Sequence, residues 1–279
     1  MSTDTVTIAV RRSAHGPSAG QRIAERWSAL WPSVTLFAAV LIAWEAIVVI
    51  FDISSFIIAK PSEIVMETIA SWDLLMEASW VTTQEIVYGF VLSILLGVGL
   101  ALLVVRFKWL DRALYPLIVL FQVVPKVALA PIFILWFGYG LTPKLWLIVV
   151  IAFFPITLNM IVGLKSFDPD LQLLTKSVGS SRSQFLAKVQ FPTSLPYLMA
   201  GLRIAITLCV IGAVVAEFSG ASSGLGYLIQ FASTQLDTPL MFAALVVISV
   251  LGLVLYYAIF WLELLVARFY PHVRTTQVQ

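Results

Sequence analysis

LLTKSVGSSRSQFLAKVQFPTSLP, residues 173–196, is the one long polar segment that stands between two membrane-length apolar runs. A segment with this many charged and hydroxyl side chains is too costly to place in hydrocarbon, so we expect it to lie outside a bilayer. The membrane-length apolar runs of the chain precede and follow this segment.

Local signals divide the polar segment into two short helices. Asp168 precedes a proline and an acidic residue, which is a typical helix start. Gly179 predicts the end of that first helix, since glycine is the usual residue just past a helix. Ser181 followed three residues later by Gln184 is a capping box for a second helix, which we expect to stop before Pro192.

The rest of the sequence is that of an integral membrane protein. Apolar residues make up 60% of the chain and charged residues 11%, and the mean hydropathy is +0.98. A span needs about 20 mainly apolar residues. Six stretches qualify, namely 33–51, 86–105, 114–137, 145–164, 197–218 and 240–267. We therefore predict an all-α fold, a polytopic membrane bundle of about six transmembrane helices.

The basic residues predict how this bundle is oriented. With the N-terminus in the cytoplasm, 13 of the 17 Lys and Arg residues lie on the cytoplasmic side or in cytoplasmic tails. Lys144 and Lys60 then lie outside, and the acidic loop 52–85, which ends at Glu85, is extracytoplasmic. The polar segment 173–196 falls in the cytoplasm, and both termini are cytoplasmic.

Four parts of the chain follow from this topology. They are a cytoplasmic N-terminal tail (1–32), a first transmembrane helix with its extracytoplasmic loop (33–85), a core (86–267) that contains the polar loop 165–196, and a cytoplasmic C-terminal tail (268–279). The N-terminal tail lacks the compact apolar region of a signal peptide.

One face of the second stretch carries only small residues. Gly89, Ser93, Gly97 and Ala101 recur at every fourth position. Small side chains let helix backbones approach closely in a membrane. This stripe predicts a packed bundle and does not indicate its function.

Polar side chains within the apolar stretches are candidates for the translocation pathway, because burying them in a membrane is costly. The four candidates are Gln122, Lys126, Arg203 and Glu217. Lys126 has no carboxylate in its own stretch, and either lining the pathway or a structural pairing would account for it. For Glu217 a structural role at the glycine-rich bend after it is the favoured interpretation. Glu263 is expected at the membrane interface.

No pattern in the sequence indicates catalysis. The lone Cys209 and the two histidines, His15 and His272, form neither a catalytic group nor a metal-ligand set, and no phosphate-binding Gly-x-x-x-x-Gly-Lys loop occurs. We predict a protein that is not an enzyme, with no catalytic residue, no metal, no cofactor and no nucleic-acid partner.

The polar segment resembles the "EAA" loop of binding-protein-dependent ABC transporter permeases. Gly179, Val189 and Pro192 stand at the positions of that pattern, and Phe191 occupies its leucine position. Residues 173–175 are Leu-Leu-Thr where the family has Glu-Ala-Ala. The runs 196–229 and 123–140 are similar to permeases of the nitrate, sulfonate, taurine and bicarbonate import group, and the likeness extends over residues 60–266.

This resemblance implies a MetI-like permease fold in the cell inner membrane, in which the polar segment contacts an ATP-binding subunit. It implies two copies of that subunit, a second permease copy in a homodimer, and an extracytoplasmic solute-binding protein. The coupling-loop residues would be Thr175, Lys176, Ser177, Gly179, Ser181, Arg182, Val189 and Pro192.

The sequence does not decide which solute is transported. Lys126 favours an anion of the sulfonate, nitrate or taurine type, whereas the run 206–218 also resembles permeases for pyrimidine precursors of thiamine or riboflavin-like compounds. A secondary transporter without an ATPase is the alternative function. Such carriers usually contain an internal repeat, and none is visible here.

Overall fold

The computed structural model describes residues 19–107, 109–113 and 124–269, and every regular element in those ranges is helical. The elements in chain order are α1 (Ala19–Ile50), α2 (Pro61–Ala70), α3 (Trp72–Arg106), the 3-10 helix η1 (Lys126–Leu129), α5 (Ala130–Phe137), α6 (Leu141–Lys165), α7 (Pro169–Ser177), α8 (Arg182–Phe185), the π-helix η2 (Leu186–Gln190), α9 (Phe191–Phe218), α10 (Leu225–Thr234) and α11 (Thr238–Phe269).

Among the described residues, five helical segments are long and apolar enough to cross a membrane. They are Trp31–Ile50, Trp72–Arg106, Leu141–Lys165, Arg182–Phe218 and Thr238–Phe269. These segments confirm the prediction of an all-α polytopic membrane bundle. The remaining stretch, 114–137, lies partly outside the described residues, and its described part is the shorter apolar segment Lys126–Phe137.

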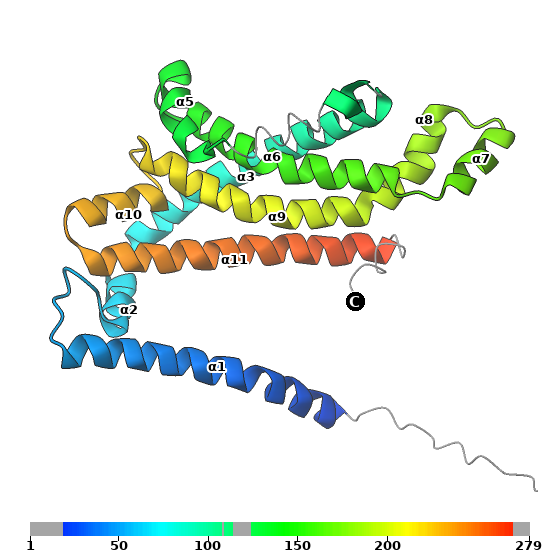
Figure 1. Cartoon of the computed structure of the whole chain (residues 1–279). Coiled ribbons are helices and arrows are strands. Elements are labelled where there is room, and N and C mark those ends of the chain that lie inside the picture. Colours follow the sequence, from blue (N-terminus) through cyan, green and yellow to red (C-terminus); the bar gives the residue numbers. More distant parts are fainter. Residues whose placement is uncertain (1–18, 108, 114–123, 270–279) are drawn as a thin grey trace, which may run out of the picture.

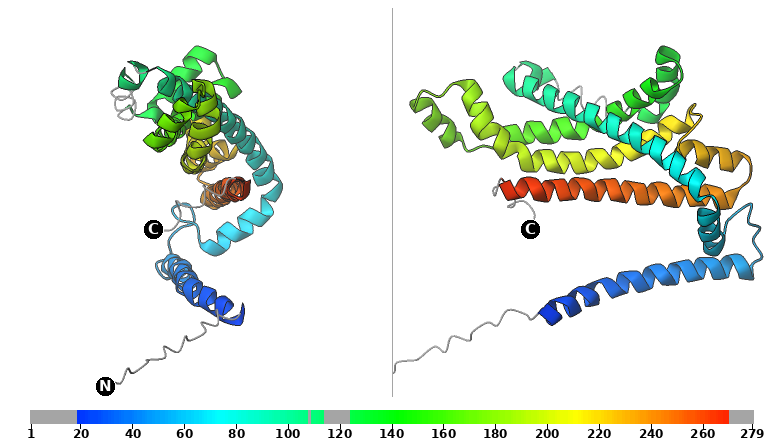
Figure 2. Two further views of the ribbon diagram at one scale, coloured as in Figure 1. Left: turned by 90° about the vertical axis from the view of Figure 1, so that its right-hand side faces the viewer. Right: turned by 180° about the vertical axis from the view of Figure 1, so that it is seen from behind.

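The core of the bundle is formed by α3, α6 and α9, with α11 lying alongside (Figures 1 and 2). The small-residue stripe of α3 faces α6, as its sequence predicts. A Cβ atom added to Gly97 would lie 3.0 Å from Cβ of Ile156, and one added to Gly89 would overlap Ile148. Only glycine therefore allows the two helices to pack at this distance, and the buried isoleucines fill the space between them.

The loop predicted at 52–85 is mostly helical. It contains α2 and the first turns of α3, so its last residue, Glu85, lies in a membrane-length helix instead of a loop. The physical reason is length: the 35 residues of α3 span about 50 Å, well beyond the roughly 30 Å of hydrocarbon, so its first turns can carry polar side chains.

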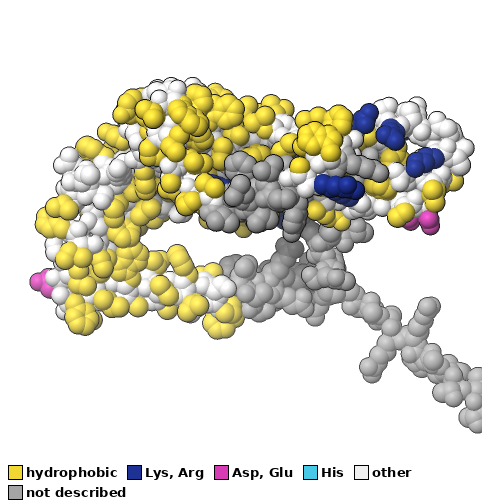
Figure 3. Space-filling model, turned by 45° about the horizontal axis from the view of Figure 1, so that its top comes forward, with side chains coloured by type: hydrophobic (Ala, Val, Ile, Leu, Met, Phe, Trp, Pro, Cys, Tyr) yellow, Lys and Arg dark blue, Asp and Glu magenta, His cyan; other side chains and the backbone are white. Residues whose placement is uncertain are grey.

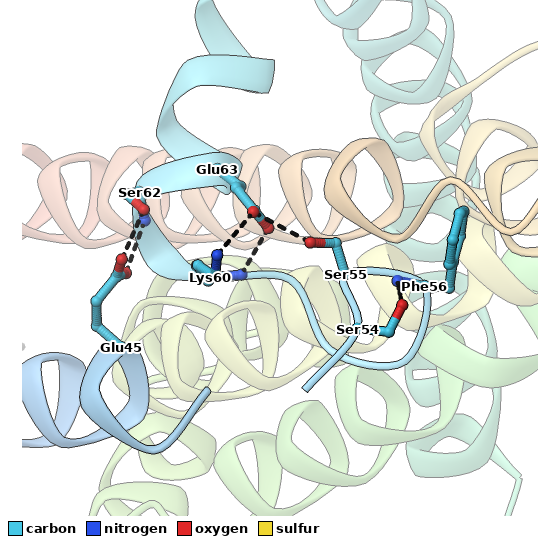
Figure 4. A network of polar contacts seen from close by, with 7 residues as sticks. All are labelled: Glu45, Ser54, Ser55, Phe56, Lys60, Ser62 and Glu63. Carbon is cyan, nitrogen blue, oxygen red and sulfur yellow. Dashed lines mark hydrogen bonds and ion pairs between the residues drawn. The ribbon is translucent and has the colours of Figure 1, made fainter. Parts of the chain in front are cut away.

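A polar network ties α1 to α2 at the corner where the chain turns (Figure 4). The Glu45 carboxylate accepts hydrogen bonds from the backbone N–H of Ser62 at 3.1 Å and from its hydroxyl at 2.7 Å. Glu63 accepts from the backbone N–H of Lys60 and from Ser55. The Lys60 N–H bond in particular lowers the pKa of Glu63. This corner fixes where α1 leaves the bundle.

Beyond that corner α1 lies to one side of the bundle (Figure 1). Trp44 contacts Phe242 of α11, with ring centroids 5.7 Å apart. The apolar side chains Val34, Leu36 and Phe37 are exposed. Such a surface suits a helix in contact with lipid or with another membrane helix, since an apolar surface this large is unfavourable in water.

Candidate functional site

The first helix of the polar segment is α7, and it has the boundaries that its sequence indicates. The Asp168 carboxylate accepts a hydrogen bond from the Asp170 N–H at 2.9 Å and so caps the helix start. After the helix, Gly179 has a φ of +74°, a conformation that glycine adopts without strain. The Ser180 N–H then donates to the Thr175 carbonyl at 3.0 Å, which completes a Schellman turn.

The second helix begins with the capping box that the sequence indicates. The Ser181 N–H donates to Oε1 of Gln184 at 2.9 Å, and the Gln184 N–H donates to Oγ of Ser181 at 3.3 Å. These reciprocal bonds satisfy two backbone donors that a helix start leaves without partners. The turn between α7 and α8 is therefore held by local bonds on both sides.

The prediction that this second helix stops before Pro192 is wrong. It continues through the π-helix η2 into α9, and Arg182–Phe218 forms one helical segment. Proline lacks an N–H and normally interrupts a helix. Here the Phe191 N–H donates five residues back to Leu186, and the Thr193 hydroxyl donates to the Val189 carbonyl at 2.7 Å. The wider turn accommodates Pro192, so the helix that starts at Arg182 joins α9 without a break.

All eight predicted coupling-loop residues are described. Six lie around the turn between α7 and α8, namely Thr175, Lys176, Ser177, Gly179, Ser181 and Arg182, and two lie at its base, Val189 in η2 and Pro192 at the start of α9. The structure thus brings them together as one continuous unit at one end of the molecule, called here the α7–α8 end (Figure 1).

An apolar face of α7 is exposed at this end. Leu171, Leu174 and Val178 follow one another at helical spacing, and the last two are 60% and 75% exposed. Exposed leucines and valines on a short polar loop indicate a surface that another protein or a membrane covers.

Gln122 and Lys126 are the two pathway candidates in the middle of the chain, and the structure describes only Lys126. Gln122 lies outside the described residues. Lys126 is the first residue of η1 and is half-buried, with its ammonium 5.7 Å from the centroid of the Phe154 ring. A cation above an aromatic face is stabilised by the ring quadrupole.

Arg203 forms an ion pair with α11. Its Nε atom lies 3.2 Å from Oε2 of Glu263, which is almost fully buried. The Glu263 carboxylate is directed into the bundle toward the charge on α9, and its position at the membrane interface stays a prediction. The pair joins α9 to α11 and places both charges where each compensates the other.

Glu217 is completely buried at the opposite end of α9. Its Oε1 accepts a hydrogen bond from the Thr82 hydroxyl at 2.7 Å, and its Oε2 accepts one from the Gly226 N–H. The same Thr82 oxygen accepts from the Leu225 N–H at 2.8 Å. The start of α10 is thereby fixed to α3 and α9 through a carboxylate and a hydroxyl.

Gly224 just before α10 has no room for a side chain. Its φ is +110°, and an added Cβ would overlap the Glu217 carboxylate. The glycine is therefore required both by the backbone conformation and by the approach of the acid. Glu217 and the glycine-rich bend form one packed unit.

A second buried charge pair lies next to this unit. Nζ of Lys144 on α6 lies 2.5 Å from Oε1 of Glu85 on α3, and their side chains are 11% and 3% exposed. Both residues were expected outside the membrane, in loops. The pair lines a cavity of about 460 Å³ together with Tyr139 and the bend 220–223.

The sequence does contain a signal for the burial of Glu85, although not for its partner. Glu85 and Thr82 continue the packed face of the small-residue stripe toward the helix start, and both are buried. Extending the stripe by two turns would have placed them inside the bundle. We name Thr82, Glu85, Lys144 and Glu217 the outer cluster.

The described residues offer no catalytic arrangement. Within them, no three His, Cys, Asp or Glu side chains are grouped as metal ligands. In the described part of the chain, one polar site is the α7–α8 end and another is the outer cluster, and the long helix α9 extends from the first to the second.

Known proteins match this chain over most of its length. Residues 89–268 match the family described as "Binding-protein-dependent transport system inner membrane component". The formylaminopyrimidine transport permease ThiX of Halalkalibacterium halodurans is 39% identical, over 85% of this chain and 94% of its own. The riboflavin transport permease RibX of Chloroflexus aurantiacus is 35% identical (87% and 91%). The taurine transport permease TauC of Escherichia coli is 29% identical (80% and 84%).

A solved structure supports the same fold. A chain of the MetNI methionine ABC transporter, in an inward-facing conformation, superposes with a TM-score of 0.62 at 20% identity, and 71% of this chain covers 98% of it. Since the family match extends over more than half of the sequence, the chain belongs to the binding-protein-dependent inner membrane component family and is the multi-pass membrane permease of an ABC importer.

Proposed function

We propose that this permease imports its solute by means of ATP hydrolysis on a separate cytoplasmic subunit, which the α7–α8 end contacts directly. The observation that carries the proposal is the capped turn between α7 and α8, continuous with α9 and exposing Leu171, Leu174 and Val178. A partner that moves this turn would also move α9. The distribution of the basic residues supports a cytoplasmic position for this end and for both termini.

Two permease copies and two ATPase copies would form the complete importer. Leu135, Trp136 and Tyr139, in and just after α5, are strongly exposed, which supports a homodimer contact along this part of the chain. A solute-binding protein would deliver solute at the α10 end, next to the outer cluster. Import in one direction requires that the ATPase, in a given nucleotide state, binds one permease conformation more tightly than the other.

The solute that we favour is an amino-substituted pyrimidine or a related heteroaromatic vitamin precursor. The support is the similarity to ThiX and RibX, which extends over more than four fifths of this chain. A sulfonate or taurine-like anion is the second candidate, supported by Lys126 and by the more distant TauC.

Reconstituted transport would test both parts of this proposal. The permease is placed in proteoliposomes with its ATPase and binding protein, and uptake of labelled formylaminopyrimidine, riboflavin and taurine is measured with and without ATP. We expect uptake of the pyrimidine only with ATP. If taurine is the only solute taken up, and only with ATP, the solute assignment is wrong and the ATP requirement is supported.

The secondary-transporter alternative makes the opposite prediction. If a proton or sodium gradient drives uptake by the permease alone, and added ATPase changes nothing, the coupling proposal is wrong. Lys126→Gln distinguishes the solute classes further: it should lower anion uptake more than pyrimidine uptake if Lys126 lines an anion pathway.

A further inference from the structure

A cavity of about 610 Å³ lies between the last turns of α3 and the coupling loop. Its polar side is formed by Arg106 from α3, Lys176 from α7 and Arg182 from α8. Its apolar side is formed by Leu102, Val105, Phe185 and Leu186. Arg106 is the last residue of a membrane-length helix, and basic side chains at the ends of such helices extend to the membrane surface.

The polar lining consists of groups that can donate hydrogen bonds. Besides the three cations it includes Gln172, Thr175, Ser180, Ser181 and Gln190, and no carboxylate is among the described residues that line it. Figure 3 shows most of the Lys and Arg side chains visible on that face gathered at the α7–α8 end. A lining of this kind is suited to an anion.

The charge of the cavity is not compensated by the described part of the chain. None of Arg106, Lys176 and Arg182 takes part in an ion pair there, and the Arg106 guanidinium lies 5.5 Å from the Phe107 ring centroid. Three like charges around one cavity repel one another, and a bound anion removes that repulsion. A multivalent oxygen acceptor such as a phosphate group suits three converging donors.

The cavity and the proposed ATPase contact use different faces of α7. Gln172, Thr175 and Lys176 share the face that lines the cavity, whereas Leu171, Leu174 and Val178 share the exposed face. A ligand in the cavity can therefore stay in place while a partner covers the outer face.

We propose that this cavity binds the phosphate headgroup of an anionic phospholipid, with an acyl chain along Leu102, Val105 and Leu186. Basic pockets at the cytoplasmic ends of membrane helices are typical sites for such headgroups. The apolar side of the cavity favours a lipid over a free phosphate ion, because it offers contacts that only an acyl chain can use. The bound lipid holds the coupling loop against α3.

The test measures lipid retention by the full-length permease alone, so it does not depend on ATP coupling. The protein is purified from nanodiscs of phosphatidylcholine with or without phosphatidylglycerol, and the phosphatidylglycerol retained is counted by native mass spectrometry. Arg106→Gln should lower its affinity about fivefold, the effect expected of one basic residue near a membrane surface. Arg106→Lys should keep most of it.

The matched control is Arg268→Gln, which removes a charge from the last turn of α11, at a position that does not line the cavity. Retention in this variant should equal that of the unchanged protein. An equal loss of retained phosphatidylglycerol in both variants would overturn the proposal, since any basic residue at the membrane surface would then bind the lipid equally well.

Two further arms separate the lipid from other anions. Inorganic phosphate added to phosphatidylcholine nanodiscs should neither bind nor stabilise the permease; competition by phosphate for the same site would overturn the lipid assignment in favour of a free anion. If Arg106→Gln releases the ATPase and leaves lipid retention unchanged, the cavity instead holds an acidic group of that partner, and the proposal is wrong.

Discussion

The α7–α8 turn and the outer cluster are the two polar sites of this permease, and they are built in opposite ways. The turn is held by bonds between residues two to five positions apart, and its side chains are largely exposed. The outer cluster is held by bonds between residues 59, 135 and 143 positions apart, and its side chains are buried. The turn therefore depends on local bonds and is exposed, whereas the outer cluster depends on long-range bonds and is buried.

This difference suggests how movement is divided along α9. A turn stabilised by its own local bonds can shift as a unit when a partner moves it, since few tertiary contacts must break. A buried network that joins α3, α6, α9 and α10 resists displacement, because separating any pair leaves a charge or a donor without a partner. We expect the α7–α8 end to move most and the outer cluster to act as a fixed point.

The largest loss of stability should follow from Lys144→Met. This change leaves the Glu85 carboxylate buried without its cation, which costs about 3–5 kcal/mol. The thermal unfolding temperature of the detergent-purified permease would reveal it. Adding Glu85→Gln to the same protein should restore much of the loss, and a double variant no more stable than Lys144→Met would contradict the role of the pair.

Glu217→Ala should have the next largest effect. It removes the acceptor of the Gly226 N–H, and one buried donor without a partner costs about 1–3 kcal/mol, whereas the Thr82 hydroxyl keeps the Ala78 carbonyl at 3.1 Å as an acceptor. Limited proteolysis at the bend 219–224 would detect the loosened start of α10. Glu77→Ala, on the exposed side of α3, is the control and should leave the cleavage rate unchanged.

The same contrast separates what the sequence predicts from what it does not. The Asp168 cap, the Ser181–Gln184 box and the stop at Gly179 depend on neighbouring residues, so their pattern alone indicates them. Glu85 and Lys144 were expected in loops because their partners lie 59 positions apart, on helices whose contact no local rule specifies. Their pairing depends on how α3 and α6 pack.

The Arg203–Glu263 pair was not predicted either, because the two residues are on different helices and the sequence does not show that they face each other. Pro192 was expected to stop a helix because a regular α-helix does not tolerate it; the π-helix η2 before it is a tertiary adjustment that its sequence does not specify.

The smallest change is expected for Ser181→Ala. Loss of the cap costs about 1 kcal/mol, and it acts only on the start of α8. Overall thermal stability should stay close to that of the unchanged protein, while hydrogen exchange at Gln184 rises. Ser177→Ala, which removes a hydroxyl that donates to the Leu174 carbonyl within α7, is the control; equal exchange at Gln184 in both variants would show that the cap does not hold this turn.

The central claim is that the α7–α8 turn transmits ATPase movement to α9, and Gly179→Val tests it most directly. Valine at a φ of +74° costs about 1–2 kcal/mol, so the turn should change shape while the chain still inserts in the membrane. Gly179→Asn, which tolerates that conformation, is the control.

The measurement is ATP-dependent uptake in proteoliposomes that contain the permease, its ATPase and its binding protein. The account predicts that Gly179→Val abolishes uptake and the stimulation of ATP hydrolysis by the loaded binding protein, whereas Gly179→Asn keeps most of both. Wild-type uptake by Gly179→Val, at an equal amount of inserted protein, would contradict it.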